Sequence, residues 1–279
     1  MTKKVIVSLI FMIVVTVTAT LFMIPNETPR LNAETPSSPV KTIDEIAYGP
    51  NILVLNYHQV DNKFTALSIP VAIFDEQMAY LSNNGYTTIT PDELYEGIEG
   101  NLSLPEKPVL ITFDDGYIDN YNNALPILKK YGMKATVFIV PGFTGNNPNY
   151  MNWNQLREME QNGITVQSHT LNHRALEELP DDEIRAELLN SKMLLEENLG
   201  HAIDYFAYPT GTYNLHIANI SKDVGYKAAY TIKYGNVDKG SNIYALERVP
   251  IFQTENTMKS FFERIEYRQS FESFGWIKR

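Results

Sequence analysis

The sequence contains no cysteine among its 279 residues. This absence excludes disulfide bonds, thiolate metal sites, a cysteine nucleophile and a lipoprotein anchor. Histidine is scarce, with five in the chain, so any metal site must combine carboxylates with a few countable imidazoles. Positive charge is also in deficit: the formal net charge is −10, which argues against a nucleic-acid-binding protein.

The N-terminus has the pattern of a targeting signal. Two lysines precede an uncharged apolar run at residues 5–24, and Pro25 ends it. A run of this length can span a bilayer as a helix, so residues 1–25 fit either an uncleaved membrane anchor or a cleaved signal peptide. In both cases we expect the rest of the chain to be exported, as an extracellular, cell-surface or outward-facing anchored protein. Residues 26–50 are polar and proline-rich, which predicts a flexible linker.

From residue 51 onward, polar helical segments alternate with short β-rich apolar runs. At five of the joints a glycine follows the helix, where the left-handed backbone conformation is often needed; these are Gly85, Gly132, Gly163, Gly200 and Gly225. The alternation predicts a single α/β domain over residues 51–279 with a largely parallel sheet.

Seven strands are expected in this domain, at residues 52–57, 109–114, 135–140, 164–168, 205–208, 228–232 and 246–251. Helices are expected at residues 72–84, 117–131, 153–162, 181–199, 214–224 and 257–266. This order fits either a barrel or an open doubly wound sheet. In both folds, ligands bind at the carboxyl ends of the strands.

Polar residues gather at those strand ends. The first expected strand leads into His58, the second ends in the pair Asp114 and Asp115, and the fourth leads into His169, followed by His173. The spacing of the last two residues predicts that both imidazoles lie on one side of a helical turn. Two imidazoles and one carboxylate form an open, catalytic type of metal site, and the remaining carboxylate could act as a general base.

Two of these segments carry a family resemblance. Residues 112–116, TFDDG, and residues 168–173, SHTLNH, closely resemble the first two motifs of the polysaccharide deacetylases, the NodB-homology group or carbohydrate esterase family 4. The resemblance covers residues 51–279 and implies a distorted (β/α)7 barrel. It further implies roles for individual residues: Asp114 as general base, Asp115, His169 and His173 as ligands of a divalent metal, usually Zn²⁺, and the backbone N–H of Thr210 as oxyanion donor.

Other family motifs are altered here. The third motif has Ala207 where the family has arginine, and the fourth has Asn149 and Asn152 where the family has acids. We interpret these changes as one coupled replacement. The family's C-terminal catalytic histidine is missing, because no histidine follows His216.

His58 is the best candidate to replace that histidine as the acid that protonates the leaving amine. Its Y-H-x-V segment resembles one branch of the family, the biofilm deacetylases of poly-β-1,6-N-acetyl-D-glucosamine. We therefore expect an enzyme that hydrolyses N-acetyl groups of this polymer. The alternatives are a peptidoglycan, chitooligosaccharide or ester deacetylase, and an inactive exported glycan-binding module.

Further expectations concern the surroundings of the site. Aromatic residues that could stack on sugars are Trp153, Tyr208 and Tyr213, with Tyr57, Phe143 and Tyr150 as weaker candidates. His201 and His216 are expected to be surface residues. The expected partner is an N-acetylglucosamine-containing polysaccharide, the expected state is a monomer, and the N-terminal segment leaves membrane association open.

Overall fold

The computed structural model describes residues 51–63, 65–252 and 257–273. The apolar run at residues 5–24 and the linker at residues 26–50 lie outside these ranges, so the predictions made for them stay predictions. Across the described ranges, no helix combines the length and the apolar character needed to cross a membrane.

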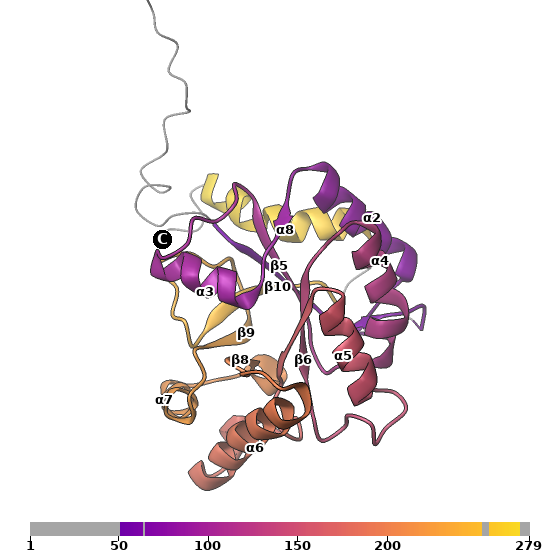
Figure 1. The fold of residues 1–279 in the computed structure, drawn as a ribbon. Coiled ribbons are helices and arrows are strands. Elements are labelled where there is room, and N and C mark those ends of the chain that lie inside the picture. Colours follow the sequence, from indigo (N-terminus) through magenta and orange to yellow (C-terminus); the bar gives the residue numbers. More distant parts are fainter. Residues whose placement is uncertain (1–50, 64, 253–256, 274–279) are drawn as a thin grey trace, which may run out of the picture. The chain divides into compact units, whose positions relative to one another are not determined.

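Seven parallel strands form a closed barrel (Figure 1). The order around the barrel is β1, β10, β9, β8, β7, β6 and β5, and β5 pairs with β1 to close it. These strands are β1 (Leu53–Tyr57), β5 (Pro108–Phe113), β6 (Ala135–Ile139), β7 (Ile164–Ser168), β8 (Tyr205–Ala207), β9 (Ala228–Tyr234) and β10 (Leu246–Pro250). The (β/α)7 barrel implied by the family resemblance is therefore confirmed, and the open sheet is excluded.

The main helices pack around this barrel (Figure 1). They are α2 (Val71–Asn83), α4 (Leu125–Lys130), α5 (Trp153–Gln161), α6 (Asp181–Leu199), α7 (Leu215–Val224) and α8 (Met258–Ser273). All five glycines at the predicted joints have positive φ, which is the conformation expected after a helix. The sequence pattern thus placed these helices to within a few residues, except at the start of α4 and the end of α8.

Alternation along the strands separates two hydrophobic clusters. Leu53, Leu55 and their counterparts on other strands pack against the helices in the larger cluster. Val54, Leu110 and Phe138 belong to a smaller cluster, which contains residues of the barrel strands but none from the six surrounding helices. Because successive strand residues point to opposite faces, this second set fills the barrel interior.

Several short elements were not predicted. A helix α3 (Pro91–Glu99) contributes Leu94 and Ile98 to the interior cluster, and β4 (Thr87–Thr88) adds to β5 in parallel. A small separate sheet pairs β2 (Gln59–Val60) with β3 (Ser68–Ile69). The helix expected from residue 117 begins instead as a π-helix, η1 (Asn120–Ala124). A single turn of π-helix is often found at functional sites.

Candidate active site and metal centre

Asp115, His169 and His173 come together just beyond the carboxyl ends of β5 and β7. Oδ1 of Asp115 lies 3.4 Å from Nε2 of His169 and 3.3 Å from Nε2 of His173. One candidate ligand atom from each residue lies within 4.8 Å of the others. One carboxylate and two imidazoles at such separations suit a divalent cation and leave coordination positions open.

The orientation of His169 also fits a metal ligand. Its ring is 2% exposed, and Nδ1 lies 2.8 Å from the carbonyl oxygen of Ala207. A carbonyl oxygen can only accept, so Nδ1 carries the hydrogen and Nε2, which faces Asp115, is left with its lone pair. The backbone of Ala207, where the family has arginine, thus fixes the ring and the tautomer of a candidate ligand.

The prediction that a helical turn brings His169 and His173 together is wrong. After β7 the chain runs as an irregular loop, and the 3₁₀ helix η2 (Leu176–Glu178) starts only beyond both residues. The loop turns sharply because Thr170 and His173 have φ values of 63° and 58°. The ring centroids of His169 and His173 still lie 4.8 Å apart, so a loop achieves what a helix was expected to do.

Backbone strain concentrates at this site. Within the described ranges, the non-glycine residues with positive φ are Asp115, Thr170, His173 and Thr210. Two of these are candidate metal ligands, one lies between the two histidines, and the fourth is the expected oxyanion residue. Since such conformations cost about 1–3 kcal/mol each, they persist only where the surrounding structure enforces them, as it commonly does at functional sites.

Asp114, the expected general base, is 2% exposed and strongly hydrogen-bonded. Arg248 donates to both of its oxygens, with Nη1–Oδ1 and Nη2–Oδ2 distances of 2.7 and 2.8 Å, and Nδ2 of Asn56 donates to Oδ2 at 3.0 Å. Burial alone would raise the pKa of Asp114, but the charges of Arg248 and His169 outweigh burial and hold that pKa well below its usual range. The carboxylate is therefore ionised whenever the protein is folded at ordinary pH.

Arg248 was missed in the sequence. It lies on β10 and is fully buried. Because it is two residues beyond Leu246 on the same strand, its side chain points into the barrel as that of Leu246 does. The sequence did carry an indication: an arginine in the middle of an apolar strand of a parallel barrel needs a buried anionic partner. The coupled replacement inferred from Ala207 and Asn152 thus has a counterpart, because an arginine from a different strand binds Asp114.

His58 lies beside this pair. Its Nε2 is 4.0 Å from Oδ2 of Asp114, too far for a hydrogen bond, and its ring packs edge-on against Phe252 at 4.5 Å between centroids. Burial lowers its pKa, although the charges of Asp114 and Asp115 partly oppose this effect. Its buried Nδ1 has no hydrogen-bond partner within the described ranges. The structure therefore places His58 next to the expected base, with a ring that is held mainly by packing.

Asn120 helps to position His58. The Asn120 side chain is fully buried at the start of η1, and its Nδ2 donates to the backbone carbonyl of His58 at 2.7 Å. The π-helix thereby ties the segment after β1 to the segment that follows Asp115. The π-helix therefore helps to fix the backbone at His58.

The expected sugar-stacking residues divide into two groups. Tyr208 is 1% exposed, and its hydroxyl donates to the carbonyl of Tyr244, so the prediction that its ring stacks on a sugar is wrong. The weaker candidate Tyr57 is fully buried and fails for the same reason. Tyr213 is half-buried and stacks on Tyr208 at 5.4 Å, and Trp153 is half-buried at the start of α5. For these two residues the role stays a prediction.

The remaining histidines are on the surface, as expected. His201 contacts Glu160 at 2.6 Å and His216 contacts Asp181 at 2.8 Å, and both imidazoles are exposed. Thr210 lies in the 3₁₀ turn η3 (Pro209–Gly211), directly after β8. Its place at a strand's carboxyl end agrees with the expected location, while its role as oxyanion donor stays a prediction.

A protein family and two known proteins match this chain in sequence. The family described as "Polysaccharide deacetylase" matches residues 101–229. YxkH of Bacillus subtilis (strain 168), which carries the provisional name of a polysaccharide deacetylase, is 36% identical over 198 residues, 71% of this chain and 70% of YxkH. The poly-β-1,6-N-acetyl-D-glucosamine N-deacetylase of Staphylococcus aureus (strain MRSA252) is 28% identical over 228 residues, 71% of this chain and 78% of its own length.

A solved structure is similar as well. The deacetylase PplD of Streptococcus pyogenes, in complex with acetate, superposes with a TM-score of 0.71 at 31% identity. The match covers 77% of this chain and 97% of PplD. The family match at residues 101–229 includes the segments that carry Asp114, Asp115, His169 and His173.

Proposed function

This chain belongs to the polysaccharide deacetylase family, and from that premise we propose that it removes N-acetyl groups from poly-β-1,6-N-acetyl-D-glucosamine. The observation that carries the choice of substrate is the place of His58 beside Asp114. His58 lies beside Asp114 and is not one of the candidate metal ligands Asp115, His169 and His173, which makes it the candidate proton donor. The Staphylococcus aureus relative, named for this substrate, supports the same choice.

The proposed roles follow from the geometry. A divalent metal, Zn²⁺ in our proposal, would be held by Asp115, His169 and His173 and would supply Lewis acidity toward the acetamide carbonyl. Asp114 accepts a proton from the attacking water, and Arg248 holds the carboxylate ionised and fixed in position. The backbone N–H of Thr210 stabilises the developing oxyanion. His58 donates a proton to the nitrogen as the C–N bond breaks, so the products are acetate and a free glucosamine unit.

Release of acetate from linkage-defined oligomers tests this proposal. We expect β-1,6-linked N-acetylglucosamine tetramers to be hydrolysed much faster than β-1,4-linked tetramers by the metal-loaded enzyme. The Asp114→Asn variant serves as the control for acetate released without the proposed base. Activity confined to the β-1,4 series would reassign the chain to the peptidoglycan or chitooligosaccharide deacetylases. If acetate is released from an O-acetylated glycan but from neither N-acetylated series, the chain is an ester deacetylase.

We also propose that the enzyme works outside the cytoplasm. The support is the basic and apolar pattern of residues 1–25 followed by the polar linker at residues 26–50. Protease added to intact cells should cleave the full chain, whereas a chain lacking residues 1–25 should be protected. Equal protection of both forms would contradict export.

A further inference from the structure

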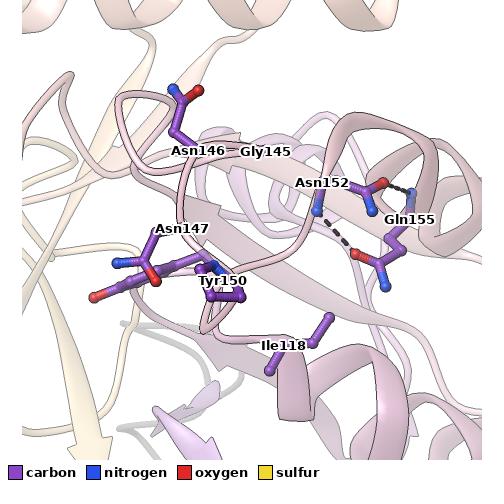
Figure 2. Close-up of a pocket in the computed structure, with 8 residues that line it drawn as sticks. Ile118, Gly145, Asn146, Asn147, Tyr150, Asn152 and Gln155 are labelled. Carbon is purple, nitrogen blue, oxygen red and sulfur yellow. Dashed lines mark hydrogen bonds between the residues drawn. The ribbon is translucent and has the colours of Figure 1, made fainter.

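A pocket of about 370 Å³ lies on the loop that leads from β6 into α5. Its size is within the range of small-molecule sites. The side chains that define its chemistry are Ile118, Asn146, Asn147, Tyr150, Asn152 and Gln155 (Figure 2). None of the residues that line it carries a charge, although the chain as a whole has a net charge of −10.

This pocket is attached directly to the segment that carries the base and a candidate metal ligand. Met151 N–H donates to the carbonyl of Gly116 at 3.0 Å, and Ile118 N–H donates to the carbonyl of Asn149 at 2.8 Å. Tyr150 lines the pocket and also stacks on Tyr117, with ring centroids 5.1 Å apart. Burial and the charge of Asp115 both raise the pKa of Tyr150. A ligand in the pocket would therefore border the site.

Three of the four amide side chains that line the pocket, those of Asn147, Asn152 and Gln155, have their oxygens already in use as acceptors. Oδ1 of Asn152 accepts from two backbone N–H groups of α5, and Oε1 of Gln155 accepts from the backbone N–H of Asn152 (Figure 2). Oδ1 of Asn147 accepts from the backbone N–H of Asn149 at 3.0 Å. Since a backbone N–H can only donate, the acceptor atoms must be the amide oxygens, and the orientation of all three side chains is settled.

Each of these three residues then has an NH₂ group to spare. Within the described ranges, Nδ2 of Asn147, Nδ2 of Asn152 and Nε2 of Gln155 make no hydrogen bond. These three donors favour ligands that offer acceptors. The acetamide carbonyl of an N-acetylated sugar is such an acceptor, whereas the ammonium group of glucosamine is a donor only and meets no carboxylate here.

We propose that this pocket binds an N-acetylated sugar unit that neighbours the unit being deacetylated, and that it disfavours a glucosamine unit at that position. The inference rests on the proposed function for its polymeric substrate. The apolar faces of Tyr150 and Ile118 would lie against the sugar ring, as is usual for a pocket with a few fixed polar groups. The enzyme would then slow as its own product accumulates along the polymer, which leaves acetylated units next to deacetylated ones.

The double variant Asn152→Asp, Gln155→Glu tests the proposal with little risk to the fold. Aspartate is a favoured N-cap residue and glutamate is the usual partner in a capping box, so both capping interactions are kept while two donors become charged acceptors. The matched control is Asn154→Asp, which adds a negative charge to the exposed face of the same helical turn, outside the pocket, and keeps its contact with Arg157. If the double variant does not fold, Asn147→Asp makes the same exchange on the loop.

Calorimetry on the full chain would compare a fully N-acetylated β-1,6 tetramer with the corresponding glucosamine tetramer, at high ionic strength to screen long-range attraction. We expect the unmodified chain and Asn154→Asp to prefer the acetylated tetramer equally. In the double variant this preference should fall by about tenfold or more, because acceptors replace donors. An equal preference in all three proteins would overturn the proposal.

Acetate release measured on the same samples separates this inference from the proposed function. A chain that shows the expected binding preferences but releases no acetate would refute the deacetylase substrate and keep the binding site. A chain that releases acetate while the double variant binds both tetramers as the control does would keep the function and refute the binding site.

Discussion

Arg248 and Asp114 form a buried, bidentate ion pair, although they are 134 residues apart in the sequence. The two side chains are 0% and 2% exposed, and the guanidinium also donates to the carbonyl of Thr231 and to the hydroxyl of Thr112. Every contact of the guanidinium is thus made inside the barrel, where neither charge can be hydrated. The pair holds the expected base in one orientation beside the candidate metal site.

Removing one partner should therefore cost more than removing both. We expect Arg248→Met to lower the free energy of unfolding by about 3–5 kcal/mol, because it leaves a buried carboxylate unpaired. The double variant Asp114→Asn, Arg248→Met should recover a large part of that loss. Urea denaturation of the two single variants and the double variant gives the coupling energy. Additive losses would show that the two side chains do not depend on each other.

Loss of the metal should abolish activity and leave the fold intact. We expect His169→Ala and His173→Ala to lower bound metal, measured by elemental analysis, together with acetate release. Asp114→Asn should keep its metal and lose about 10²–10⁴-fold in rate, because the proposed proton transfer is removed while the three candidate metal ligands stay in place. The control is His216→Ala, which changes an exposed histidine paired with Asp181. Full activity after chelation would remove the metal from the mechanism.

His58→Ala should lower the rate without releasing the metal. The imidazole lies beside Asp114 but is not one of the three candidate metal ligands. We therefore expect kcat to fall on the order of 10²–10³-fold while the metal content stays unchanged. His58→Gln is the conservative companion, since it restores volume against Phe252 without an acidic proton. Recovery of activity in His58→Gln would show that His58 acts by packing, and loss of metal would show that it is a ligand.

Thr210→Gly should stabilise the protein by about 1 kcal/mol. Thr210 is exposed with a φ of 60°, a conformation that costs a β-branched residue about 1–2 kcal/mol and costs glycine little. Thr212→Gly is the matched control, because φ there is an ordinary −85° and both changes remove the same hydroxyl–hydroxyl contact. Thermal and urea unfolding should show opposite signs for the two variants. A loss of stability in both would mean that Thr210 is not strained.

His201 should stabilise the protein only at low pH. Burial alone would lower its pKa, but its hydrogen bonds to the carbonyl of Ala202 and to Glu160 raise it above the usual value. A raised pKa means that the folded state binds the proton more tightly, so the contribution is present below the unfolded pKa and is lost as pH rises through the folded pKa. His201→Ala should therefore lower Tm by about 1–2 °C near pH 5.5 and not near pH 8.5. A pH-independent effect would contradict the pairing.

The sequence determined most of the strands and helices because they have strong local patterns, whereas the choice of a barrel over an open sheet came from the family resemblance. The glycine joints and the apolar runs located all seven barrel strands, and the segments at residues 112–116 and 168–173 located the metal group. Short elements such as β4 and the π-helix η1 were not predicted, because their conformation depends on contacts rather than on periodicity. The helical turn expected at His169 failed for a similar reason, since two positive-φ residues shape that loop.

Only the tertiary structure decided which residues surround Asp114 and how the amides of the pocket are oriented. Closure of β10 against β1 brings Arg248 to Asp114, and no local pattern encodes a partner 134 residues away. Burial of Tyr208 depends likewise on the packing of β8 and the segment around Tyr244. Periodicity in a sequence reports which face of an element is buried, whereas the pairing of individual polar groups depends on distances that exist only after the barrel has closed.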